Sequence, residues 1–166
     1  MAISKVKFDK IKMEIKMPKV EGKADTKKMQ LAVNKALSRG AQKGSTYVEK
    51  SLREALDNSL QSQWTWIQGS RDIVDTGRLK SSLEIKAVFS QTKVSFKIAY
   101  NVPYAGLVHY GGMIKPYGNR NAADVLIPAR PWVTAVLEGS HGQPQFDMRT
   151  PFDLGISEAW SSQFGT

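Results

Sequence analysis

The feature that most constrains the fold is a long apolar periodicity between Thr26 and Leu60. Apolar side chains recur there every three or four residues, the spacing of one face of an α-helix: Met29, Val33, Leu37, Val48, Leu52, Leu56 and Leu60. A helix of this span is about 50 Å long at about 1.5 Å per residue, which is unusual in so small a domain. One long helix therefore organises the expected fold.

Two glycines, Gly40 and Gly44, fall on the same stripe of this helix, together with Ala36 and Ala55. A glycine inside a helix costs about 1 kcal/mol relative to alanine, so the pattern predicts a kink or break at this point. The alternative interpretation is that the small residues permit a second helix to pack closely.

The amino-terminal residues alternate apolar side chains with lysines, which predicts a strand with one apolar and one lysine face. The phase of the alternation slips at Asp9 and Lys10, as a bulge or bend between two short strands requires. Pro18 ends the run. We interpret residues 1–22 as an N-terminal β-strand arm that pairs either within its own sheet or with a neighbouring subunit.

Further strands and helices are expected along the rest of the chain. Glu84 to Phe89 and Lys93 to Ala99 read as a hairpin, and Val125 to Ile127 as a short strand that Pro128 stops. Pro131 suits the first turn of a short helix that runs to Gly139. The tail contains an ambiguous helical patch at Leu154, Ile156, Ala159 and Trp160.

These elements define an α+β fold, in which an antiparallel or mixed β-sheet packs against one long, kinked or straight, α-helix with short additional helices. The length and the hydrophobic content of 41% fit one core domain with appendages. We expect the core domain at residues 23–140, between the N-terminal arm and a C-terminal extension at residues 141–166.

The positive charge is concentrated near the amino terminus. The chain carries a net charge of +9, and residues 1–50 hold 13 basic and 5 acidic side chains. Such asymmetry favours an acidic partner, either nucleic acid or an acidic protein surface. A solvated lysine face is the alternative.

The sequence gives little sign of catalysis. It contains no cysteine, no phosphate-binding or dinucleotide-binding glycine motif, and no nucleophile elbow around a serine. His109 and His141 lack neighbours at metal-ligand spacing, and we expect His109 to be packed or hydrogen-bonded as a structural residue. We therefore expect no enzyme activity, no cofactor and no metal. No apolar stretch is long enough to span a membrane, and we expect no membrane partner.

Three local motifs stand out. In DTGRLKSSL, Asp75 or Thr76 is placed to cap a short helix that buries Leu79 and Leu83. Arg78 is left over, either exposed or paired with a carboxylate, and an ion pair between subunits is one functional interpretation. The second motif, YAGLVHYGG, is a short apolar segment closed by two glycines, which permit either positive φ or a close approach of the backbone. The third, IPARPW, joins a strand exit to a helix start, and packing does not explain its Arg130.

In this order and spacing, the three motifs resemble those of small tailed-bacteriophage proteins of the head-tail joining, neck or tail-completion family. In that family a Thr-Gly-Arg-Leu element, a Tyr-Ala-x-x-x-(His or Glu)-Tyr-Gly element and an Ala-Arg-Pro-aromatic element recur together. The resemblance covers roughly residues 40 to 140 of this sequence. The lysine-rich amino-terminal strand and the tail after Ser140 lie outside the shared pattern.

The resemblance implies a structural virion protein that forms a ring at the head-tail junction. The ring, hexameric or dodecameric, would join head-completion or connector proteins to tail tube or tail terminator proteins. It would be assembled in the host cytoplasm and would touch viral DNA transiently in its lumen. The interaction candidates are Arg78, Tyr104, His109, Tyr110, Arg130, Trp132, Lys5, Lys7, Lys12 and Lys16. The alternative function is a basic nucleic-acid-binding accessory protein of phage origin.

Overall fold

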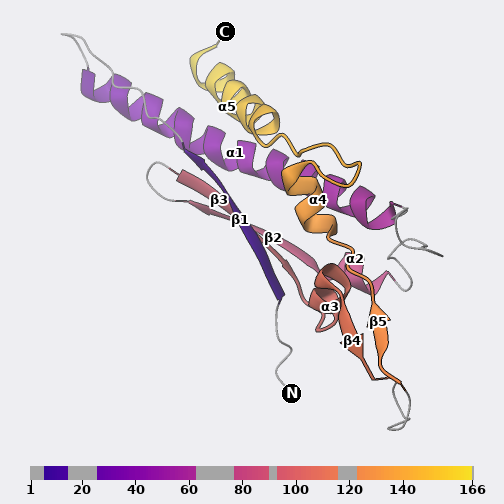
Figure 1. Cartoon of the computed structure of the whole chain (residues 1–166). Coiled ribbons are helices and arrows are strands. Elements are labelled where there is room, and N and C mark those ends of the chain that lie inside the picture. The colour runs from indigo at the N-terminus through magenta and orange to yellow at the C-terminus, as the bar shows by residue number, and fades with distance from the viewer. Residues whose placement is uncertain (1–5, 15–25, 63–76, 90–92, 116–122, 166) are drawn as a thin grey trace. The chain divides into compact units, whose positions relative to one another are not determined.

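A computed structural model describes residues 6–14, 26–62, 77–89, 93–115 and 123–165, and it has the expected α+β composition (Figure 1). Three strands form one sheet in the order β1-β3-β2, and β4 and β5 form a second, antiparallel sheet. The elements in chain order are β1 (Val6–Glu14), α1 (Thr26–Gln61), α2 (Arg78–Ser81), β2 (Leu83–Phe89), β3 (Lys93–Tyr100), α3 (Ala105–Tyr110), β4 (Gly112–Ile114), β5 (Val125–Ile127), α4 (Trp132–Glu138) and α5 (Arg149–Phe164).

The amino-terminal strand belongs to the chain's own sheet, where β1 pairs with β3. It is one strand from Val6 to Glu14, so a division into two short strands at Asp9 and Lys10 was wrong, and the alternative, a bulge, stays a prediction. Backbone pairing does not depend on which face the apolar side chains occupy, and the slip in phase therefore does not end the strand. The expected end of the strand at Pro18 lies outside the described residues.

The chain divides into two compact units, and α1 contributes to both of them. We call them the aromatic unit and the basic unit, for the features described below. The aromatic unit comprises Met1–Asp9, Arg53–Glu84 and Ile98–Phe146, and the basic unit comprises Lys10–Leu52, Ile85–Lys97 and Asp147–Thr166.

The core of the aromatic unit is formed by apolar side chains from α1, β3 and α4. Leu56 and Leu60 of α1, Ile98 and Tyr100 of β3, and Trp132 and Val133 of α4 are almost completely buried. The hydroxyl of Ser59 on α1 donates a hydrogen bond to the carbonyl oxygen of Trp132 over 3.2 Å. This bond ties α4 to α1.

In the basic unit, α5 packs against α1 at its glycines. A Cβ atom built on Gly44 would lie 2.6 Å from the carbonyl oxygen of Phe152, and one built on Gly155 would lie 2.2 Å from the nitrogen of Gly44. α1 is unbroken from Thr26 to Gln61, so the expected break at Gly40 and Gly44 was wrong. The alternative is confirmed, because the glycines let a second helix approach the backbone of α1.

The sheet side of the basic unit is also anchored to α1. Val48 and Leu52 of α1 and Val94 and Phe96 of β3 are fully buried. The Glu49 carboxylate accepts a hydrogen bond from the backbone nitrogen of Ala87 on β2 over 3.1 Å. The long helix therefore packs on the sheet, as the sequence predicts.

Candidate functional site

The second and third motifs meet at the buried indole of Trp132. Its Nε1 donates a hydrogen bond to the hydroxyl of Tyr100 over 3.0 Å, and the two rings are edge to face at 5.4 Å between centroids. The His109 ring packs edge to face on Trp132 at 4.8 Å. A backbone bond of 3.0 Å from Arg130 N to the Val108 carbonyl joins the two motifs directly. Motifs far apart in the sequence thus form one cluster.

His109 has a structural role in this cluster. Its side chain is 1% exposed, and its Nε2 lies 3.2 Å from the hydroxyl of Thr134 on α4. Within the described ranges, no three His, Cys, Asp or Glu side chains are grouped so that they could hold a metal ion. The arrangement fits a packed and hydrogen-bonded histidine, as expected from the sequence.

A close approach of backbones fixes the end of the second motif. Gly111 has a φ of 73°, the left-handed region that favours glycine. A Cβ atom on Gly111 would lie 2.7 Å from the nitrogen of Ala129 and 2.8 Å from the carbonyl oxygen of Ile127. This position therefore admits only glycine without a shift of the third motif.

Beside the cluster, the β4-β5 hairpin exposes a patch of large apolar side chains. Met113 and Leu126 are cross-strand partners and are 59% and 66% exposed. Val125 of β5 is also exposed, and so is Tyr110 at the end of α3. Val125 precedes Leu126 in β5 and therefore faces the opposite side of the strand pair. We call Tyr110, Met113 and Leu126 the hairpin surface. Sequence reasoning missed Met113 because β4 is too short to show a period, and it predicted the β5 strand without singling out Leu126.

The first motif forms α2 and the start of β2. Leu79 and Leu83 are buried, as predicted, and Arg78 is exposed. The expected place of Leu83 on the same helix was wrong, because α2 ends at Ser81 and Leu83 is the first residue of β2. The residue that precedes the helix is Gly77, at φ 70°, and it makes no side-chain cap. The predicted caps, Asp75 and Thr76, lie outside the described residues. Lys80 forms an ion pair of 3.6 Å with Asp57 of α1.

The ten interaction candidates differ in accessibility. Arg78, Tyr110 and Lys12 are exposed, and Tyr104 and Arg130 are half-buried. His109 and Trp132 are buried, so they support the surface from below and are not available to touch a neighbouring subunit. Lys5 and Lys16, and the side chain of Lys7, lie outside the description. The Nε atom of Arg130 is buried and has no hydrogen-bond partner among the described residues.

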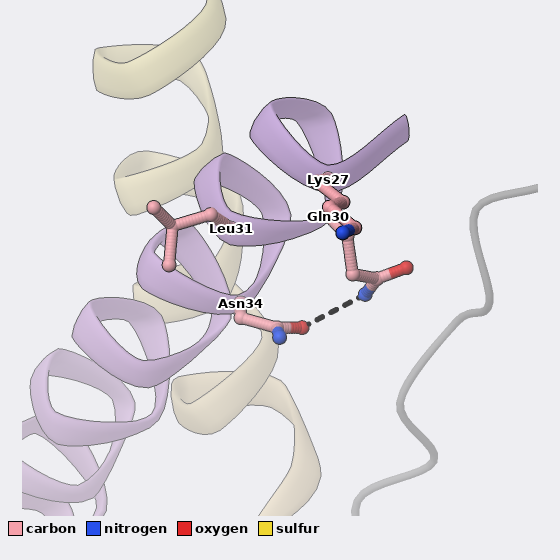
Figure 2. A pocket seen from close by; sticks show the side chains of 4 residues that line it. All are labelled: Lys27, Gln30, Leu31 and Asn34. Atoms are coloured by element: carbon pink, nitrogen blue, oxygen red, sulfur yellow. Dashed lines mark hydrogen bonds between the residues drawn. The ribbon is translucent and has the colours of Figure 1, made fainter. Parts of the chain in front are cut away.

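A surface depression on the first turns of α1 offers no enclosed site (Figure 2). It is lined by Lys27, Gln30, Leu31 and Asn34, all from one helix. Three of these side chains are exposed, and the fourth, Gln30, donates a hydrogen bond to Asn34 over 2.9 Å. The aromatic cluster and its hairpin surface are therefore the stronger candidate.

Comparison of the chain with protein-family models, with curated proteins and with solved structures found no match to any of them. Among the helices that the structure describes, none is long and apolar enough to cross a membrane.

Proposed function

We propose that this chain is a structural virion protein of a tailed phage, which forms a ring at the head-tail junction and joins the capsid connector to the tail. One observation carries the proposal. The second and third motifs of the resemblance form a single buried cluster around Trp132, directly beside an exposed apolar hairpin. The motifs thus make a rigid support for a contact surface, which is what a ring subunit needs.

The hairpin surface is suited to contact between subunits. Exposed apolar patches of this kind are typical of protein interaction sites, and cross-strand pairs such as Met113 and Leu126 place both side chains on one face. In the described part of the chain, β4 and β5 pair only with each other. Each strand therefore has an edge that can extend a neighbour's sheet. A head-to-tail contact of this kind closes into a ring after a fixed number of copies.

Light scattering and negative-stain microscopy test the proposal on the full chain, alone and with virion extract. We expect closed rings, or capture of the protein on tail ends. The paired variant Met113→Glu with Leu126→Glu should remain folded and lose assembly, since charges on both strands oppose apolar contact. A wild-type protein that stays strictly monomeric and joins no tails contradicts the proposal.

The matched control is Val88→Glu with Phe89→Glu, which places the same charge on two exposed apolar residues of β2. This variant should assemble like the wild type. Equal loss of assembly in both variants would show that added negative charge, and not the hairpin surface, prevents association.

A further inference from the structure

The basic side chains are segregated in one of the two units. The basic unit has 15 Lys and Arg against 7 Asp and Glu, a net charge of +8, whereas the aromatic unit has 9 against 8. The hairpin surface belongs to the nearly neutral aromatic unit. The excess charge of the chain therefore belongs to a different unit from the surface that we assign to assembly.

Within the basic unit, cations line one face of α1. At about 100° per residue, five exposed side chains fall within about 80° of the helix circumference. They are Lys28, Lys35, Arg39, Lys43 and Lys50, and we call them the cationic face. The set spans about 33 Å at about 1.5 Å per residue. α1 has no Asp or Glu between Thr26 and Val48.

The nearby carboxylates already have hydrogen-bond partners, and one of these partners is Lys43 of the cationic face. Glu158 of α5 accepts hydrogen bonds from Lys43 and Tyr47, and Glu49 accepts its bond from the β2 backbone. Arg39 donates to the side chain of Gln163 over 3.3 Å. Within the described residues, no ion pair joins Lys28, Lys35 or Lys50 to a carboxylate, so these three are the cations that a partner can neutralise.

We propose that the cationic face of α1 binds the phosphodiester backbone of duplex DNA without sequence preference. A linear array of cations on one helix is the electrostatic footprint of a nucleic-acid-binding protein. An acidic protein partner fits less well, because protein interfaces place aromatic and apolar side chains at their centre and deplete lysine. Between the cations, this face carries only Ala32 and Thr46. Only the identity of the DNA as viral DNA rests on the proposed function. The binding itself can be tested with any duplex.

The experiment measures binding of the full chain to a labelled duplex of random sequence by fluorescence anisotropy between 50 and 300 mM salt, values on the order of physiological ionic strength. The variant Lys28→Gln with Lys35→Gln and Lys50→Gln removes three cations and keeps helix propensity. If each lysine contacts a phosphate, the slope of log K against log salt should fall by about 2.7. Affinity at low salt should weaken about tenfold or more.

The matched control is Lys86→Gln with Lys93→Gln and Lys97→Gln, which removes the same charge from exposed lysines of β2 and β3 in the same unit. Its slope should change much less. Equal losses in the two variants would show that binding follows net charge, and would overturn the assignment to α1. Absence of wild-type binding at low salt overturns it too, as does tighter binding to polyglutamate, which indicates an acidic protein partner.

Assembly and DNA binding fail separately in these experiments. The Met113→Glu, Leu126→Glu variant should lose assembly and keep the salt slope per subunit, and the lysine variant should show the reverse. A monomer that binds DNA through α1 refutes the ring and leaves this inference standing. If the protein forms rings and the lysine variant binds DNA as the wild type does, the inference about α1 is refuted and the proposed function is not.

Discussion

The indole nitrogen of Trp132 donates a hydrogen bond to the hydroxyl of Tyr100 over 3.0 Å, and both side chains are fully buried. Tyr100 is the last residue of β3, and Trp132 is the first of α4. With the His109 ring also packed edge to face on the indole, these contacts hold a strand and two short helices together. The hairpin surface depends on this support, because Gly111 links it to the cluster through the close contact with Ala129.

Tyr100→Phe should destabilise the chain by about 1 to 3 kcal/mol, since it leaves a buried indole N–H without an acceptor. The free energy of unfolding in urea measures the loss. Trp132→Phe and the double variant complete a mutant cycle. Additive losses in that cycle would show that the two side chains do not interact.

Stability should also fall at alkaline pH because of Tyr100. Burial raises the pKa of Tyr100 far above its ordinary value of 10.0, so the folded state favours the neutral phenol. The stabilisation from this group is complete below pH 10 and is lost as the pH rises beyond it. The urea midpoint of the wild type should therefore drop between about pH 9 and 11, and the drop should be smaller in Tyr100→Phe. An identical drop in both proteins contradicts the role of this phenol.

The elements with a strong local period could be predicted from the sequence. The long helix, the β2-β3 hairpin and α4 follow spacings of apolar residues that are visible in the sequence, and β5 is a short apolar run that Pro128 stops. α5 remained ambiguous, because its buried face consists largely of Phe152, Gly155 and Ala159 while Leu154 and Trp160 are exposed. β4 escaped detection since only its pairing with β5 defines it.

The arrangement of the candidate site could be predicted only in part. The three motifs were visible, but nothing local shows that Tyr100, His109 and Trp132 converge, or that Trp132 is buried. The glycines of α1 led to the wrong prediction of a break, because their contact with α5 depends on Gly155, which lies far along the chain. The cationic face had a visible signal in the helical spacing of Lys28, Lys35 and Arg39, but the lysines that the sequence singled out as interaction candidates lie in the N-terminal segment.

Gly155→Ala should weaken the docking of α5 on α1. The added methyl would lie 2.4 Å from the Gly44 Cα, and backbone cannot yield as a flexible side chain does. Overpacking of this kind typically costs about 1 to 3 kcal/mol. We expect a lower urea midpoint and faster proteolysis at α5. Ser157→Ala, at an exposed position of the same helix, is the matched control and should change neither. A stable Gly155→Ala protein would refute the close contact.

The ion pair of Lys43 with Glu158 should make α5 docking sensitive to acid. The Lys43 ammonium and then the Tyr47 hydroxyl lower the pKa of Glu158 below its ordinary value of 4.5. A lowered carboxyl pKa contributes stability above pH 4.5 that is lost as the pH falls through the lowered value. Asp147 contributes in the same direction, because bonds from the Thr150 side chain and the Arg149 backbone lower its pKa as well.

The test compares urea midpoints at pH 7 and pH 3 for the wild type and for Glu158→Gln. The variant should have the lower midpoint at pH 7 and the smaller fall on acidification, since it retains no titrating carboxyl beside Lys43 and Tyr47. Asp153→Asn removes the same charge from the same helix, where the carboxylate contacts only Arg149 among the described residues. If Asp153→Asn reduces the acid response as much as Glu158→Gln does, the response comes from the overall charge of α5, and the bond between Glu158 and Lys43 is not its cause.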